Sequence, residues 1–358
     1  MIALMEPADV TNGLSEGSIT RFLLFSLLKI VPVVAVMMFI VAYAVYVERR
    51  VAAFIQDRIG PNRVGPFGLF QPIADGAKSF FKEDYVPGHV RKIYYWLAPA
   101  IMMIPSLITV AVIPFGSRIG EQKMVIADLN VGVLYTFGIV SLGVYGIVLA
   151  GYAANSKYPF MGGIRSSAQL ISYEIAMGMS VIPVFLLVGD LNLSTVIGYQ
   201  APGLTHWLVF RQPLAFAIFL AAAFAETNRL PFDLPEAEQE LAGGYNVEYS
   251  SIKFALFFMG EYANMIAAAA MMVTLFFGGW TLPWWGLDHP ATSMAMGFVH
   301  VGLFLAKVLT LLGVIIWVRW MWPRFRYDQL MGLGWKRFVP LALANIVVTA
   351  VVLWIRSA

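Results

Sequence analysis

Residues 254–277 read FALFFMGEYANMIAAAAMMVTLFF, an apolar run with one charged side chain, Glu261. As an α-helix these residues would extend about 36 Å, enough to cross the roughly 30 Å hydrocarbon core of a bilayer. Seven other apolar runs have a similar character, so we expect eight membrane spans. They are predicted at Phe22–Tyr46, Trp96–Pro114, Val131–Ala154, Ala168–Val188, Leu208–Ala225, Phe254–Phe277, Met294–Trp317 and Phe338–Ile355.

The composition supports a membrane protein. Hydrophobic residues make up 59% of the chain and charged residues 13%, with a mean hydropathy of +0.75, whereas soluble domains carry about 25% charged residues. Within hydrocarbon the backbone must pair with itself, and the unbroken runs lack the alternation of barrel strands. We therefore predict one all-α integral membrane domain over residues 1–358. Its weakest span is the fifth, which Arg211 and Gln212 interrupt.

The sequence offers no ligands for a resident cofactor. The chain has no cysteine, which excludes thiolate-bound iron–sulfur clusters, and none of its four histidines has the i, i+4 spacing of a helical metal site. Phosphate-loop and dinucleotide-binding motifs are absent, and no basic tract indicates a nucleic-acid surface. We expect no cofactor on this chain and no nucleic-acid partner.

An amphipathic helix is predicted at 67–83, between the first two spans. Phe70, Ile73, Ala77 and Phe80 recur at helical spacing, with polar and charged residues between them. This pattern is typical of a helix that lies in the membrane interface. The alternative is a short helix packed into the core.

Positive charges are distributed unequally between the two sides of the predicted bundle. The loops after the first, third, fifth and seventh spans hold 17 of the 24 lysines and arginines, against five on the other side. The positive-inside rule places the first set of loops, which are long, in the cytoplasm or the mitochondrial matrix. Both termini should then face the periplasm or intermembrane space.

The first long loop combines charges of both signs with glycine–proline turns. Arg49 ends the first span, Arg58 follows, and Asp75 lies on the amphipathic helix. Charged pairs at a membrane edge can hydrogen-bond a polar headgroup whose tail lies in lipid. An ordinary positive flank with a solvated turn is the alternative.

Acidic residues also occur inside or beside the spans. Glu174 lies within an apolar run, where a carboxylate costs on the order of 2–3 kcal/mol, so it should face a partner or a wet cavity. Residues 226–261 hold seven carboxylates and two cations, which favours shared protons over a fully ionised cluster. Arg229 would pair with Glu226 if the fifth helix continued that far. A solvated acidic loop or a helix-end glutamate is the alternative.

Several long motifs resemble those of the H-subunit family of proton-translocating NADH:quinone oxidoreductases, the respiratory complex I enzymes. They are QDRIGPNRVGPFGLFQPIADGAKSFFKED at 56–84, SKYPFMGGIRSSAQLISYE at 156–174, ETNRLPFDLPEAEQELAGGYNVEYSSIKFALFFMGEYANM at 226–265 and RFRYDQLMGLGWK at 324–336. The resemblance covers nearly the whole chain.

This resemblance implies a membrane component that anchors a peripheral arm, in which partner subunits contain the NADH site, FMN and iron–sulfur clusters. It implies contacts with small membrane subunits and lipid, a quinone substrate, and a bacterial inner membrane, or a mitochondrial one if organellar. The residues expected to meet quinone are Arg49, Arg58, Asp75, Arg229 and Asp233. Those expected to relay protons are Glu174, Glu226, Glu240, Glu248 and Glu261.

Two other functions fit the same residues. Membrane subunits of hydrogenases and of ferredoxin- or F420-linked complexes are homologous to this family. A stand-alone cation or proton transporter could use the same acids, although such transporters usually contain internal repeats and none is evident here.

Overall fold

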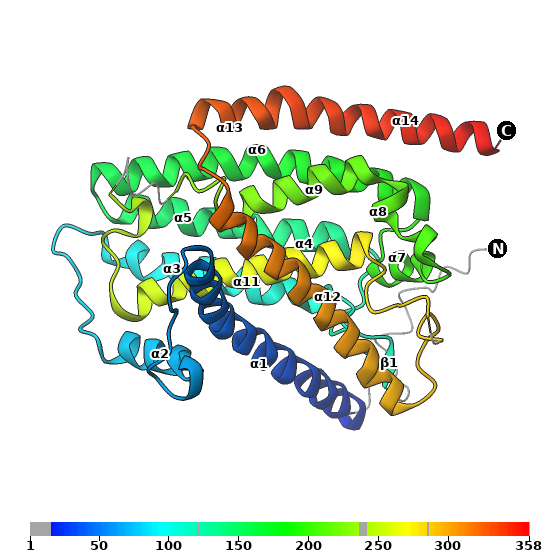
Figure 1. The fold of residues 1–358 in the computed structure, drawn as a ribbon, viewed down its shortest axis with the longest axis horizontal. Helices are drawn as coiled ribbons and strands as arrows, with labels where there is room; N and C mark the ends of the chain where they lie inside the picture. Colours follow the sequence, from blue (N-terminus) through cyan, green and yellow to red (C-terminus); the bar gives the residue numbers. More distant parts are fainter. Residues whose placement is uncertain (1–15, 120–121, 236–241, 285, 358) are drawn as a thin grey trace.

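The computed structural model describes residues 16–119, 122–235, 242–284 and 286–357, with side chains from residue 24 onward. Long helices lie side by side in one elongated bundle (Figure 1). The strands in the described part of the chain, β1 (Arg118–Ile119) and β2 (Gln122–Lys123), form a short antiparallel pair in which Arg118 faces Lys123. The predicted all-α membrane architecture is confirmed.

Seven helical segments of the described chain are long and apolar enough to span a membrane. The helices that form them are α1 (Glu16–Ile55), α3 (Lys92–Thr109), α4 (Gly132–Val140) with α5 (Leu142–Ala153), α6 (Lys157–Val188), α11 (Ser251–Phe276), α12 (Met294–Met321), and α13 (Tyr327–Leu333) with α14 (Val339–Ser357). A π-helical turn, Gly334–Phe338, joins the last two. The short helix α7 (Leu193–Gln200) lies between α6 and α8.

The predicted fifth span is shorter than a full crossing. It consists of α8 (Leu208–Arg211) and α9 (Pro213–Glu226), separated at Gln212, whose φ and ψ of −133° and 58° are not helical. The next residue, Pro213, has no N–H to donate, so it cannot continue α8. It is instead the first residue of α9, where that hydrogen bond is not needed. The 14 residues of α9 extend about 21 Å. The buried amide of Gln212 donates to Thr349 Oγ1 at 3.0 Å and accepts from Asn345 Nδ2 at 3.1 Å, both on α14.

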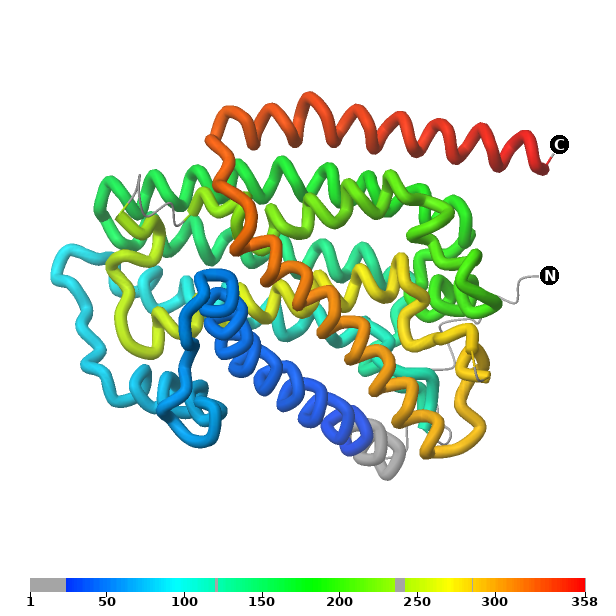
Figure 2. Tube along the Cα trace, in the orientation of Figure 1, coloured from blue at the N-terminus to red at the C-terminus, as the bar shows by residue number. Residues whose placement is uncertain are grey.

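The bundle has two different ends. One, here called the α2 end, carries α2 (Gln71–Phe81) and the loops around it, and the other, the α7 end, carries α7, α8 and the β1–β2 pair (Figure 1). The described part of α1 begins at the α7 end, and α14 finishes there (Figure 2). An even number of crossings would produce this arrangement.

The core forms around α11, whose residues are mostly buried, whereas α1 and α14 expose most of theirs. Close approach between α3 and α5 depends on Gly146, because a Cβ there would lie 2.9 Å from the backbone nitrogen of Met102. Gly151 similarly brings α5 against α6, since its Cβ would meet the carbonyl oxygen of Pro159 at 2.6 Å.

Helix α2 follows the predicted amphipathic pattern. None of its residues is buried, and its apolar side chains are open, with Phe80 73% and Phe81 91% exposed. The alternative of a core-packed helix is therefore wrong. Exposed aromatic rings beside Lys78 and Lys82 suit a surface that meets headgroups and lipid.

Candidate functional site

The turn that follows α9 folds into the bundle. The helix ends at Glu226, and Asn228 adopts a left-handed conformation with φ of 50°. Gln169 of α6 fastens the turn, because its Nε2 donates to the carbonyl oxygens of Ala225 and Phe232, each at 2.7 Å. This turn therefore delivers its polar side chains to the interior at the α2 end.

Arg229 and Glu261 form a buried ion pair. Arg229 Nη2 lies 3.4 Å from Glu261 Oε2, and both side chains are less than 5% exposed. The hydroxyl of Tyr245 donates to Glu261 Oε1 at 2.9 Å, and the Arg229 guanidinium lies 4.3 Å from the centre of the Tyr262 ring. Removing one partner from a buried pair usually costs about 3–5 kcal/mol, so these groups depend on one another.

A second, partly buried ion pair adjoins the first. Glu48 of α1 pairs with Arg319 of α12 and accepts a hydrogen bond of 2.6 Å from the hydroxyl of Tyr262. The side chain of Tyr262 thus contacts Glu48 through its hydroxyl and Arg229 through its ring. The two ion pairs are joined through one tyrosine.

A third ion pair completes the group. Arg324 Nη2 lies 2.8 Å from Asp233 Oδ2, and Asp233 is near enough to Glu261 to act on it electrostatically. Among the described residues, three carboxylates and three guanidiniums are therefore paired within this group. We call the following set the buried charge cluster: Glu48, Arg229, Asp233, Tyr245, Glu261, Tyr262, Arg319 and Arg324.

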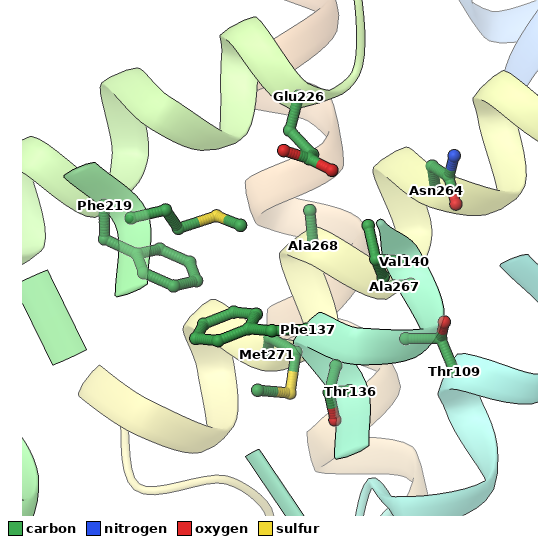
Figure 3. A pocket seen from close by; sticks show the side chains of 11 residues that line it. Thr109, Thr136, Phe137, Val140, Phe219, Glu226, Asn264, Ala267, Ala268 and Met271 are labelled. Carbon is green, nitrogen blue, oxygen red and sulfur yellow. The ribbon is translucent and has the colours of Figure 1, made fainter. Parts of the chain in front are cut away.

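Glu226 lies apart from the ion pairs of this cluster. Its side chain is buried, and its Oε2 has no hydrogen-bond partner among the described residues. The carboxylate points into a cavity between α3, α4, α9 and α11, with Asn264 on the facing helix (Figure 3). Glu174 is near enough to interact with it electrostatically.

Glu174 lies on a partly exposed side of α6. It is half-buried, within reach of the Ser141 hydroxyl, while its neighbours Ile171 and Ile175 are 53% and 40% exposed. Lipid alone is a poor environment for a carboxylate.

The remaining predicted residues lie elsewhere. Arg49 Nη1 is 2.7 Å from Asp75 Oδ2 in a partly exposed ion pair, whereas the exposed Arg58 bonds Gln56 at 2.7 Å. Glu248 lies in the loop before α11, 3.7 Å from the imidazole of His89. Glu240 lies outside the described residues.

The conditional pairing of Arg229 with Glu226 is wrong. It required α9 to continue past Glu226, but the helix ends there, and the turn places Arg229 beside Glu261.

Sequence reasoning also missed important members of the cluster. Arg319 and Tyr262 had no assigned role, and Arg324 was noted only within the motif at 324–336. Arg319 lies within one turn of the end of α12, and Arg324 just beyond it, whereas Tyr262 lies about three turns into α11, so no single local signal identifies all three.

Tyrosines dominate the loop side of the cluster. Tyr95 and Tyr249 stack at 4.2 Å, and Tyr249 and Tyr245 both contact Phe257 edge-on. Burial raises the pKa of the Tyr249 hydroxyl, which therefore stays protonated at neutral pH. In the part of the chain that the structure describes, no three histidine, aspartate or glutamate side chains are grouped to hold a metal ion.

Comparison with known proteins gives similarity along most of the chain. The family described as NADH dehydrogenase matches residues 28–350. An NADH-quinone oxidoreductase H subunit of Koribacter versatilis, numbered 2 in that organism, is 47% identical over 350 residues, covering 93% of this chain and 98% of the relative. The H subunit of the Rickettsia typhi enzyme is 51% identical over 327 residues, covering 91% and 93%. The eighth subunit of the Rhodothermus marinus enzyme is 48% identical over 325 residues, covering 89% and 94%.

Proposed function

Because this chain belongs to the NADH dehydrogenase family of membrane subunits, whose curated relatives are named as the H subunits of NADH-quinone oxidoreductases, we propose that it forms part of a quinone chamber and links quinone reduction to proton translocation. It is a subunit of an oxidoreductase complex and works with that complex's other subunits. The active site is completed by partners.

The observation that carries this proposal is the buried charge cluster. Among the described residues it pairs three acids with three arginines at close range, so an added negative charge nearby would act on each of these pairs. Reduction of a quinone creates such a charge transiently. Arg229 is the group best placed to respond, because it contacts both Glu261 and the Tyr262 ring.

The response would continue through Glu226 and Glu174. Glu226 is buried, and one of its carboxylate oxygens has no hydrogen-bond partner among the described residues; Glu174 continues the series of acids to the partly exposed side of α6. A small membrane subunit covering that surface would receive the signal, as a proton or as a change in field. Glu240 and Glu248 remain proposed members of this relay.

The quinone headgroup would enter past Arg49, Arg58 and Asp75, at the edge formed by α1 and α2. The exposed apolar face of α2 supports contact with lipid there. Arg229 and Asp233 would face the headgroup from inside. Quinone is thus a substrate, and FMN and iron–sulfur clusters belong to the peripheral-arm partners that dock on the loops of the α2 end.

We place the complex in the bacterial inner membrane, with the α2 end in the cytoplasm and the termini in the periplasm. The charge asymmetry of the loops supports this orientation. The names of the relatives favour a quinone enzyme over a hydrogenase-type complex, and their status as subunits disfavours a stand-alone transporter.

The test replaces Glu226 and Glu174 separately by glutamine in the assembled complex, reconstituted in vesicles. Glutamine preserves shape and some hydrogen bonding but holds no titrating proton. We expect each variant to assemble and to oxidise NADH with an artificial acceptor at the normal rate, while quinone reduction and proton pumping fall at least about tenfold. Asp328→Asn, which alters an exposed acid, is the matched control. Wild-type turnover and pumping in both glutamate variants would reject the relay.

A further inference from the structure

Glu226 borders two cavities. The first is also lined by Thr109, Thr136 and Phe219, and the second by Asn228 and other residues towards the α2 end. Two residues besides Glu226 line both cavities, namely Val140 and Asn264. Glu226 and Asn264 therefore lie between the two cavities and present polar groups to both.

The first cavity extends away from the α2 end. Along α9 its lining runs from Glu226 back to Phe219, and along α11 it runs from Asn264 on to Met271 (Figure 3). Each stretch is seven residues, about 10 Å of helix. From Glu226 and Asn264, both stretches lead towards the α7 end, so the lining of this cavity, which has a volume of about 30 Å³, extends from the carboxylate in that direction.

Water fits the polar groups of this cavity. The hydroxyls of Thr109 and Thr136 donate to the carbonyl oxygens of Pro105 and Gly132 at 2.8 and 2.9 Å, which leaves their oxygens able to accept. Asn264 makes no side-chain hydrogen bond to another described residue, and one Glu226 oxygen is likewise free among these residues. A buried water needs two to four such partners.

We propose that Glu226 exchanges protons with water in both cavities, and that Asn264 is a positioning residue that holds the water between them. This rests on the proposed relay and adds a second route, directed towards the α7 end. An excess proton on water (hydronium) in one cavity passes to the carboxylate and leaves neutral water. The carboxylic acid then gives a proton to water in the other cavity, which becomes hydronium, so only O–H bonds break and form and the carboxylate is regenerated. The amide of Asn264 can donate and accept but does not titrate.

The apolar part of the lining limits leakage. Phe137, Phe219, Met177 and Met271 surround the first cavity and give water few partners. A continuous water column is therefore disfavoured, and transfer depends on the two threonines and Asn264. Replacing them should slow the proton transfer without altering the charged residues.

The experiment compares Asn264→Leu, Asn264→Ser and Thr136→Val in the assembled, vesicle-reconstituted complex. Leucine fills similar space without a polar group, whereas serine keeps one and leaves room for water. Thr310→Val is the control for Thr136→Val, because Thr310 donates the same kind of bond, 2.8 Å to Ala306, on an exposed helix face. NADH oxidation by an artificial acceptor measures assembly.

We expect Asn264→Leu to lower quinone-coupled proton pumping about five- to tenfold, the equivalent of one or two hydrogen bonds, and Asn264→Ser to restore most of it. Thr136→Val should lower pumping severalfold and Thr310→Val should not. The infrared carboxyl band of protonated Glu226, assigned by its loss in Glu226→Gln, should shift in Asn264→Leu. A band that stays in place would overturn the positioning role.

The variants distinguish a wrong water route from a wrong relay. If Glu226→Gln abolishes pumping while Asn264→Leu and Thr136→Val pump normally, the water route is rejected and the relay stands. If Glu226→Gln itself pumps normally, both are rejected. If the complex does not assemble with Asn264→Leu, Thr136→Val decides the question, because valine and threonine have nearly the same shape. Normal pumping in Thr136→Val would then overturn the water route.

Discussion

The hydroxyl of Tyr262 in α11 donates a 2.6 Å hydrogen bond to Glu48 in α1, although the two residues are 214 positions apart in sequence. Few residues of helix α1 are buried. This contact and the Glu48–Arg319 pair therefore help to hold its C-terminal part against the core. The same tyrosine places its ring against Arg229. We therefore expect a movement of charge at Arg229 to change the contact between Tyr262 and Glu48.

Replacement of Tyr262 by phenylalanine tests this connection, because it removes the hydroxyl and keeps the ring. We expect quinone reduction in the assembled complex to fall severalfold, as Glu48 is then held by Arg319 alone. A double-mutant cycle with Glu48→Gln should give a coupling energy of about 0.5–3 kcal/mol. Tyr145→Phe, at an exposed tyrosine, is the control. Additive effects would show that the hydrogen bond transmits nothing.

The Arg49–Asp75 pair gives a prediction for quinone binding. Both side chains are partly exposed, and a surface ion pair contributes only about 0–1 kcal/mol to stability. If the pair serves only stability, Arg49→Ala and Asp75→Asn leave the quinone KM unchanged. We expect instead a raised KM and a lower rate of quinone reduction, with normal NADH oxidation by an artificial acceptor. Normal quinone kinetics in both variants would refute a role in the chamber.

Asp128, at the α7 end, gives a prediction for pH. Burial alone would raise the pKa of its carboxyl, but hydrogen bonds from Lys123 at 2.6 Å and Asn192 at 2.9 Å, with further help from Ser194, hold it below the ordinary value of 3.8. A lowered folded-state pKa contributes stability above the unfolded value and loses it as pH falls through the folded value.

A spin label on Asn130→Cys, in this cysteine-free chain, reports how firmly the segment near Asp128 is docked. We expect the label to stay ordered at neutral pH and to become mobile below about pH 4. In an added Asp128→Asn background it should be more mobile at neutral pH and change little with acid. Equal pH profiles in the two backgrounds would show that this carboxylate does not hold the segment.

Membrane orientation can be measured directly. The excess of positive charge on the loops of the α2 end predicts that Ala358 faces the periplasm. A periplasm-dependent reporter fused there should be active, and the same reporter in the loop after α5 should be inactive. If a reporter fused at Ala358 is active only when it lies in the cytoplasm, and it is active there, the proposed orientation is wrong.

Local pattern was sufficient to predict most helices. Apolar length identified seven of the expected spans, and the spacing of Phe70, Ile73 and Phe80 predicted α2. These properties depend on residues close together in the chain. The fifth span was less accurate, because Pro213 and Gln212 determine where its helix begins.

The arrangement of the site was less accessible from sequence. Glu261 and Glu226 stood out because carboxylates are rare in apolar runs, but their partners come from other helices. Nothing local indicates that Tyr262 meets Glu48, or that Arg229 turns towards Glu261. Such pairs depend on how helices pack, which periodicity within one helix does not encode.

The contact between Gln212 and α14 has a consequence for how the chain is made. Gln212 lies where the fifth span is interrupted, and its amide is satisfied by Thr349 and Asn345 of the last helix. While the ribosome is still synthesising α14, that amide lacks both partners, and a bare amide in hydrocarbon is costly. Docking of α14 therefore supplies the hydrogen bonds that satisfy the interruption between α8 and α9, so we expect the fifth span to reach its final position together with the last helix.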